Sequence, residues 1–270
     1  MSDPGVAGSV VVVTGAASGI GRALAERFAA DGARAVVILD RDATAAAAVA
    51  DTLSSPASLG LGVDVTDEAA LREAVVRIET DLGPIDVWCS NAGIATAEGL
   101  GDDDDWDRAW RVHVLAHVYA ARHVLPGMAD RGRGRFVITA SAAGLLTEMD
   151  SAPYPVTKHA AVALAEWLAI RYGDHGVGLH CLCPQAVRTP MTAGFGPESA
   201  TLAAGAMLEP EQVAQATAQA LAEGRFLILP HPEVAEFERR RSTDRDRWLA
   251  GMRRVRSALL SRRTAPPEED

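Results

Sequence analysis

Lysine is almost missing from this chain of 270 residues: among its 26 basic residues only Lys158 is a lysine, and the others are arginines. A generic surface cation at position 158 would be expected to be arginine too, so the exception indicates that an amine is needed there. A compact ammonium on a flexible stem presents its hydrogens differently from a planar guanidinium. Lys158 follows Tyr154 by four residues, which puts both side chains on one face of a helix.

Positive charge is also in deficit, because the formal net charge is -10. Binding to nucleic acid irrespective of sequence relies on cations that neutralise phosphates, so this class of function is disfavoured. Long apolar runs are lacking as well: the first strongly apolar stretch, Val10 to Val13, is far too short to span a membrane and has no basic flank typical of a secretory leader. We therefore expect a cytoplasmic protein without a membrane partner.

Cysteine is scarce, with three residues in the whole chain. Cys181 and Cys183 alternate along an expected strand and Cys89 lies in another, as small buried hydrophobes do. Their spacing is not the Cys-x-x-Cys typical of metal or redox sites, so we expect neither a bound metal nor a disulfide framework.

Short apolar runs alternate with helical stretches up to about residue 230, which is typical of a doubly wound α/β fold with a parallel sheet covered on both faces. The predicted strands are Ser9 to Val13, Ala35 to Leu39, Leu59 to Val63, Val87 to Ser90, Arg135 to Thr139, Val177 to Cys183 and Phe226 to Leu229. The predicted helices cover residues 19-31, 43-54, 67-81, 103-129, 153-172 and 209-223.

No linker, repeat or low-complexity tract divides this series, so we predict one domain over residues 1-232 and an arginine-rich helical extension over 233-270. The extension carries apolar residues at helical spacing, which favours packing against the body or a neighbouring subunit over a membrane or nucleic-acid role. These residues are Trp248, Met252, Val255 and Leu259.

A glycine-rich turn follows the first predicted strand and opens a helix. It contains Gly15, Ser18, Gly19, Ile20 and Gly21. Glycines allow close approach of the backbone to a pyrophosphate, which then accepts hydrogen bonds from free amides at the helix N-terminus. The turn therefore predicts a dinucleotide site.

The second strand ends at Asp40, about twenty residues beyond the glycines, where a carboxylate can bind the adenosine ribose hydroxyls and repel a 2′-phosphate. Arg41 could instead pair with that phosphate. We therefore expect NAD in preference to NADP. Asp64 and Val65, after the third strand, are expected beside the adenine, although Asp64 could equally serve as a helix cap.

Taken together, residues 8 to 230 resemble the short-chain dehydrogenase/reductase family. The resemblance is carried by Thr14-Gly15-x-x-x-Gly19-x-Gly21, Asn91-Ala92-Gly93, Ser141 thirteen residues before Tyr154, the Tyr154-x-x-x-Lys158 pair, and a segment from Pro184 through Val187 to Thr189. It implies a Rossmann fold, with Asn91, Ala92, Gly93, Tyr154, Lys158, Pro184, Val187 and Thr189 around the cofactor. By resemblance Thr189 would hold the nicotinamide carboxamide, Val187 would sit near the ring, and the chain would pair as a dimer or tetramer through helices 103-129 and 153-172.

Two residues depart from the family pattern. Gln185 replaces a usual glycine, and His113 stands where most members have an asparagine of the catalytic relay. An imidazole both donates and accepts, so His113 could carry the same proton path, or it could impair it. With His117 it forms His-x-x-x-His, but the missing glutamate and partner ligands disfavour zinc.

The implied chemistry is hydride transfer between NAD(H) and a secondary alcohol or ketone, with Tyr154 as general acid and base. Moving the tyrosine pKa from about 10 to about 7 takes roughly 4 kcal/mol. A cation at about 4 Å and an effective dielectric near 20 supplies about that much before desolvation. Lys158 is placed to be this cation, and Ser141 to donate a hydrogen bond to the substrate oxygen.

The segment 192-208 contains Phe195, Leu202, Met207 and Leu208 and reads as a lid over a mostly apolar small substrate. Two other functions compete with the NAD-linked dehydrogenase. An NADP-linked carbonyl reductase is favoured by Arg41, and a dinucleotide-binding sensor or scaffold with decayed catalysis is favoured only by His113 and Gln185.

Overall fold

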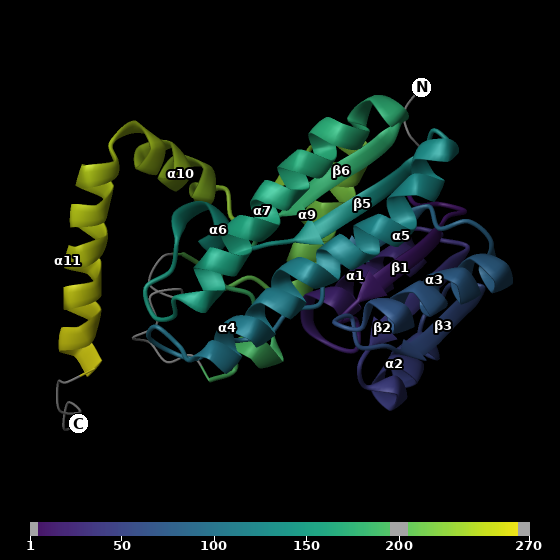
Figure 1. Cartoon of the computed structure of the whole chain (residues 1–270), viewed down its shortest axis with the longest axis horizontal. Coiled ribbons are helices and arrows are strands. Elements are labelled where there is room, and N and C mark those ends of the chain that lie inside the picture. The colour runs from purple at the N-terminus through teal and green to yellow at the C-terminus, as the bar shows by residue number, and fades with distance from the viewer. Residues whose placement is uncertain (1–4, 195–204, 264–270) are drawn as a thin grey trace.

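The computed structural model describes residues 5-194 and 205-263 and contains one seven-stranded sheet. All strand pairs are parallel, in the order β3-β2-β1-β4-β5-β6-β7 (Figure 1). The strands are β1 (Val10–Thr14), β2 (Ala35–Asp40), β3 (Ala57–Gly62), β4 (Val87–Ser90), β5 (Gly134–Thr139), β6 (Val177–Leu182) and β7 (Leu227–Ile228). The predicted doubly wound, seven-stranded Rossmann fold is confirmed.

Helices cover both faces of this sheet. One face carries α1 (Gly19–Ala30), α2 (Ala43–Ala50) and α9 (Pro210–Glu223); the other carries α3 (Glu68–Leu82), α5 (Ala116–Asp130) and α7 (Pro153–Tyr172), which lie in front of the strands in Figure 1. A separate hydrophobic core fills each interface. Burial on both faces explains why strands such as β1, with every residue buried, are continuous apolar runs without alternation.

The structure corrects several predicted boundaries. The helix predicted over 103-129 is α4 (Asp103–Trp110) and α5, joined by a π-helical segment over Arg111–Leu115. Strand β3 begins two residues early because Ala57 and Ser58 pair with β2, and the second helix ends at Ala50. The short helix α6 (Ala143–Leu146), just after Ser141, was not predicted.

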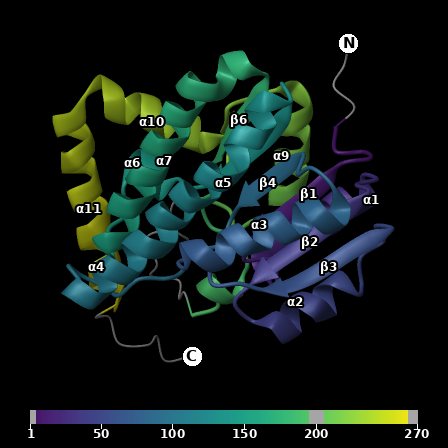
Figure 2. The ribbon, with the colours of Figure 1, turned by 45° about the vertical axis from the view of Figure 1, so that its right-hand side comes forward.

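The C-terminal extension forms two helices, α10 (Glu233–Thr243) and α11 (Arg245–Arg263), with Asp244 between them. Figure 2 shows them on the side of the molecule that carries α4 and α6. The Trp248 ring lies 6.5 Å from that of Phe237, and both rings pack against the core, as expected for part of the apolar stripe. Within the described ranges, no helix has the length and apolar character needed to cross a membrane.

Candidate active site

A cavity of ≈1590 Å³ lies at the carboxyl edge of the sheet and extends to the C-terminal helices. Its walls include every residue predicted to bind the cofactor, together with Ser141. His113 is the exception among the predicted site residues, because it does not line the cavity. The predicted lid lies largely outside the described residues, although Met191, Thr192 and Gly194 line the cavity on its near side.

The glycine turn is shaped by close backbone contacts. Gly15 has a φ of 63°, and a Cβ at this position would lie 2.8 Å from the Ala92 Cα. A Cβ on Gly21 would collide with the Gly15 carbonyl oxygen. Both positions therefore exclude larger residues, and the N-terminus of α1 is brought against the loop after β4. Ser18 precedes α1 without a capping hydrogen bond from its side chain, so the helix amides have no side-chain cap at this end.

Thr14 joins this turn to the Asn91-Ala92-Gly93 segment. Its Oγ1 accepts hydrogen bonds from the backbone N–H groups of Asn91 at 2.9 Å and Ala92 at 3.0 Å. The Asn91 Nδ2 donates in return to the Thr14 carbonyl oxygen at 3.0 Å. These bonds fix the ends of β1 and β4 together and set the shape of the cofactor side of the cavity.

Asp40 ends β2 beside the glycine turn. One carboxylate oxygen accepts from the Ala17 N–H at 3.1 Å and the other from the Asp42 N–H at 3.2 Å. Arg41 is exposed and lines the same cavity. Asp64 accepts from both the N–H and the hydroxyl of Thr66 at 2.8 Å, while Asp67 caps α3. Asp64 thus forms a local turn and lines the cavity at the same time.

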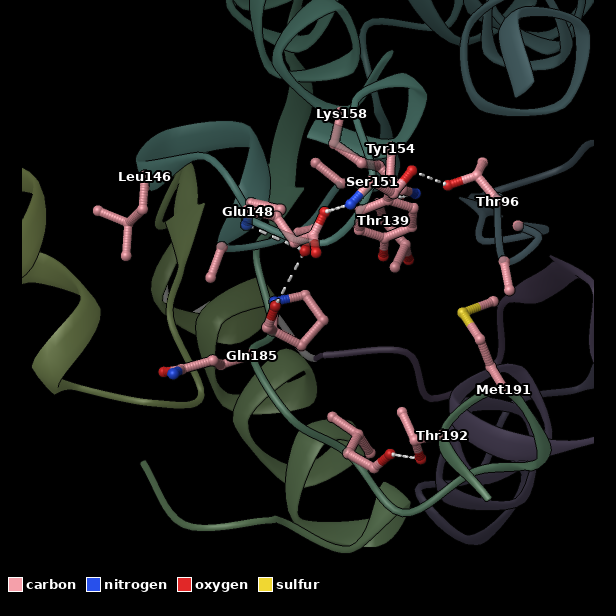
Figure 3. Close-up of a pocket in the computed structure, with 18 of the residues that line it drawn as sticks. Thr96, Thr139, Leu146, Glu148, Ser151, Tyr154, Lys158, Gln185, Met191 and Thr192 are labelled. Carbon is pink, nitrogen blue, oxygen red and sulfur yellow. Dashed lines mark hydrogen bonds between the residues drawn. The ribbon is translucent and has the colours of Figure 1, made fainter. Parts of the chain in front are cut away.

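Ser141, Tyr154 and Lys158 line the same cavity, and Figure 3 shows Tyr154 and Lys158 close together at one end of it. The Lys158 Nζ lies 5.8 Å from the centre of the Tyr154 ring and donates to the Thr139 carbonyl oxygen at 3.1 Å. Ser141 accepts from the Ala143 N–H at 3.1 Å, so the first turn of α6 holds its hydroxyl. A helix spacing of four has placed the phenol and the amine as expected.

Burial sets the charge state of this group. It lowers the pKa of the Lys158 amine to about 8, because the side chain is only 3% exposed. Burial also raises the pKa of the Tyr154 phenol. The hydrogen bond with Ser141 lowers that pKa, but the effect of burial is larger. The phenolate expected from the sequence is therefore opposed by burial and favoured by the Ser141 hydrogen bond.

His113 lies in the π-helical segment behind Gly93, completely buried. The Thr157 hydroxyl donates to the Pro153 carbonyl oxygen at 2.8 Å, so it accepts from the His113 Nδ1–H at 2.9 Å. The Nε2 then accepts from the Ile94 N–H at 3.1 Å. Burial and the nearby Lys158 charge hold the pKa of the imidazole well below its ordinary value. Both ring nitrogens are thus engaged within the protein.

The other histidine of the pair is held through one ring nitrogen. His117 Nδ1 is hydrogen-bonded to the Ser90 hydroxyl at 2.6 Å, and burial lowers the pKa of its ring to about 3. Across the described part of the chain, no group of three or more potential metal-ligating side chains is positioned around a common point.

The cysteines lie in the buried core, where the Sγ atoms of Cys181 and Cys183 are 3.7 Å apart.

The loop after β6 depends on a residue that the sequence did not reveal. His231, 2% exposed, accepts from the Gln185 N–H at 3.2 Å through Nδ1 and donates through Nε2 to the carbonyl oxygens of Ala186 at 3.1 Å and Ala206 at 3.2 Å. It therefore ties the loop to the end of the 192-208 segment. The Gln185 side chain lines the cavity, and its buried Oε1 forms no hydrogen bond with any residue that the structure describes.

Glu148 is a cavity residue that the sequence did not reveal. It lies beside Tyr154 in Figure 3, and its carboxylate accepts from the backbone N–H groups of Asp150 at 2.5 Å and Ser151 at 2.9 Å. Burial raises the pKa of this carboxyl, and its charge in turn raises the pKa of Tyr154. The preceding Thr147 has a φ of 79°, which is strained for a residue with a side chain.

The model of the short chain dehydrogenase family matches residues 9–200. Among curated proteins, a meso-2,3-butanediol dehydrogenase of Serratia marcescens is 35% identical over 76% of this chain and 84% of its own length. A 1-deoxy-11-beta-hydroxypentalenate dehydrogenase of Streptomyces avermitilis is 36% identical over 84% of this chain and 86% of its own length. A (-)-isopiperitenol/(-)-carveol dehydrogenase of Mentha piperita is 32% identical over 84% of this chain and 91% of its own length. The chain belongs to the short-chain dehydrogenase family.

Solved structures agree in fold. A Burkholderia phymatum short-chain dehydrogenase/reductase in complex with NAD has a TM-score of 0.80 at 32% identity, covering 89% of this chain and 95% of that one. A Sphingobium yanoikuyae short-chain dehydrogenase in complex with NADPH has a TM-score of 0.74 at 25% identity, and the match covers 97% of this chain and 98% of that one. Together with the relatives, they define an oxidoreductase acting on CH–OH groups with a nicotinamide cofactor.

Proposed function

We propose that the protein transfers a hydride between NAD(H) and a secondary alcohol or ketone, with Tyr154 as the general acid and base. The observation that supports this most strongly is that Ser141, Tyr154 and Lys158 share one cavity with the glycine turn and Asp40. The fit to a dinucleotide is supported by the close backbone approach at Gly15 and by the α1 amides left without a side-chain cap.

When bound, the nicotinamide supplies a hydride acceptor or donor and, in its oxidised form, a positive charge. Tyr154 takes the hydroxyl proton of the alcohol in oxidation and returns it to the ketone oxygen in reduction. Ser141 donates a hydrogen bond to the same oxygen and stabilises its developing charge. Lys158 contributes an ammonium charge that favours the phenolate, which burial disfavours.

We assign His113 a positioning role. Its Nδ1–H bond to Thr157, on the same helix as Tyr154 and Lys158, and its Nε2 bond to Ile94 anchor the π-helical segment against the site. His113→Asn, which keeps a donor and an acceptor, is expected to retain comparable turnover, and a chelator is expected to leave activity unchanged. A large loss in this variant, or zinc-reversible inactivation, would contradict the assignment.

NAD is the proposed cofactor because the Asp40 carboxylate disfavours a 2′-phosphate. NADP is the alternative, supported by the exposed Arg41 and by the NADPH bound in the Sphingobium yanoikuyae neighbour. Binding titrations with both cofactors decide between them. We expect NAD to bind more tightly than NADP, and the difference in affinity to be smaller in Asp40→Ala. Equal or tighter NADP binding by the wild type would give the carbonyl-reductase alternative the advantage.

The substrate is proposed to be a small, largely apolar alcohol or ketone. Apolar cavity residues support this, among them Ile94, Leu146, Met149 and Met191. The names of two relatives, a butanediol dehydrogenase and an isopiperitenol/carveol dehydrogenase, support a small alcohol. An absorbance screen for reduced nicotinamide against cyclic and aromatic secondary alcohols and ketones tests the function. Binding of NAD without turnover of any member, in wild type and Tyr154→Phe alike, would favour the sensor or scaffold.

We further propose a homo-oligomer that pairs through α4, α5 and α7. Large exposed apolar side chains support this: Trp110 on α4, and Val156, Trp167 and Ile170 on α7, with Ile170 84% exposed. Sedimentation velocity is expected to show a dimer or tetramer that Ile170→Glu dissociates, and a monomeric wild type would refute the proposed oligomer.

We also propose a cytoplasmic location, which the buried free cysteines support. Cell fractionation tests this location.

A further inference from the structure

One face of α11 forms a wall of the cavity. The lining residues on this helix are Arg247, Trp248, Gly251, Met252, Arg254 and Val255. Their spacing places them on one side of a helix with 3.6 residues per turn, whereas Arg253 and Arg256 fall on the opposite side and do not line the cavity. The wall combines an apolar stripe with two arginines seven residues apart.

These two arginines differ from the others that the extension contributes to the cavity. Arg239 and Arg240 are paired with Glu236 at 2.8 and 2.7 Å. Arg247 and Arg254 form no ion pair with any residue in the ranges 5-194 and 205-263. Asp244 is used as the cap of α11, accepting from the Arg247 N–H at 2.9 Å. Among the described residues, Arg247 and Arg254 therefore line the cavity without an ion-pair partner.

The wall stands at the substrate end of the cavity. Helix α10 contacts α6, which directly follows Ser141, and α11 is connected to the body through α10 (Figures 1 and 2). The cofactor end, by contrast, is built by the glycine turn, Asp40 and Asp64. A group bound at Arg247 and Arg254 would therefore belong to the part of a substrate remote from the reacting carbon.

We propose that Arg247 and Arg254 bind an anionic group, a carboxylate or a phosphate, at the far end of a substrate whose hydrocarbon body lies along Trp248, Met252 and Val255. This proposal rests on the proposed function and narrows its substrate class to hydroxy or keto compounds with an anionic terminus. A guanidinium suits both anions because its planar fork donates two parallel hydrogen bonds. The substrate is thus amphipathic, neutral at the reacting carbon and charged at the other end.

The test uses three probes with one hydrocarbon body: an (ω-1)-hydroxydecanoic acid, its methyl ester and its coenzyme A thioester. Each is assayed with NAD on the wild type, on the double variant Arg247→Gln/Arg254→Gln, and on the control Arg253→Gln/Arg256→Gln. The control removes the same charge from the opposite face of the same helix. The KM for NAD is measured in parallel, because a change there would show that the arginines serve the cofactor instead.

We expect the wild type to use the acid or the thioester at least about tenfold more efficiently than the ester, judged by kcat/KM. The double variant should lose this preference while keeping its activity on the ester, and the control should keep both. A preference for the acid alone identifies a free carboxylate as the anion, and a preference for the thioester alone identifies a phosphate carrier. Equal use of acid, ester and thioester by the wild type, or equal losses in both double variants, would overturn the proposal.

Calorimetric binding separates this proposal from the proposed function. The acid or the thioester should bind the NAD complex of the wild type more tightly than the ester does, and the difference should vanish in Arg247→Gln/Arg254→Gln. Turnover failure with selective binding of an anion would reject the proposed reaction and keep the anion site. Turnover of the probes with no selective binding would keep the proposed reaction and reject the anion site.

Discussion

At position 158 the chain buries its one lysine, on a helix that packs against α6. The amine donates to Thr139, and Gly144 of α6 packs so closely on α7 that an added Cβ would lie 2.5 Å from the Lys158 carbonyl oxygen. Burial lowers the pKa of the amine to about 8, so the folding free energy bears a cost for keeping it charged at neutral pH. A purely structural role would not need such a group.

Lys158→Arg should therefore reduce turnover by at least about tenfold, equivalent to about 1.4 kcal/mol of transition-state stabilisation. The guanidinium keeps the charge but cannot occupy the space of the amine beneath the phenol. Steady-state kinetics on any substrate identified by the screen measures the loss, and cofactor titration checks that the variant still binds NAD. Turnover equal to that of the wild type would show that only the charge matters.

Glu148 sets a second expectation at this scale, on pH dependence. Its negative charge raises the pKa of Tyr154, and oxidation requires the phenolate. Glu148→Gln should lower the pKa of the phenol, so the rise of the oxidation rate with pH should move to lower pH. The control is Glu98→Gln, which removes an exposed carboxylate of the same cavity that is not among the causes of the Tyr154 shift. An unchanged profile in Glu148→Gln would disprove the coupling.

Among the elements, the loop after β6 is the one most dependent on a distant side chain. His231 precedes α10, yet its three hydrogen bonds hold Gln185, Ala186 and Ala206. His231→Leu would remove all three hydrogen bonds, of which the one to the Ala186 carbonyl oxygen is buried and the other two are partly buried, at about 0.5–1.5 kcal/mol each. We expect a clearly lower unfolding midpoint and a raised KM for the substrate.

His231→Gln provides the matched control, because its terminal amide can still donate toward Ala186 and Ala206. It should recover most of the lost stability and most of the KM. Urea unfolding and steady-state kinetics on both variants measure the two effects. If the glutamine variant were as impaired as the leucine variant, the donated bonds would not be what orders the loop.

The elements differ in how far they could be predicted. The strands were predictable because burial on both faces makes them continuous apolar runs. The π-helical segment around His113 was not predictable, because its sequence continues the helical pattern and its buried hydrogen bonds, to Thr157 and Ile94, are made with residues distant in the chain. Helix α6 is four residues long, too short for a periodic signal.

At the scale of the whole molecule, the cofactor turn, Asp40 and Ser141 could be predicted because they lie at or just beyond the carboxyl ends of parallel strands, where such strands end together. Tyr154 and Lys158 could be predicted from their spacing of four on one helix. Two contributions to the cavity could not be predicted. Glu148 sits in a loop without a motif, and the face that α11 turns to the cavity depends on how α10 lies against α6. Such long-range packing leaves no local pattern in the chain.

The central claim is that Tyr154 moves the proton that accompanies hydride transfer. The most direct measurement is a single-turnover experiment: enzyme saturated with NAD is mixed with an active secondary alcohol, and absorbance of the reduced nicotinamide is followed in wild type and Tyr154→Phe. The account predicts that Tyr154→Phe binds NAD with nearly unchanged affinity but forms reduced nicotinamide at least about a thousandfold more slowly, about 4 kcal/mol in the barrier. Formation at the wild-type rate in Tyr154→Phe would contradict it.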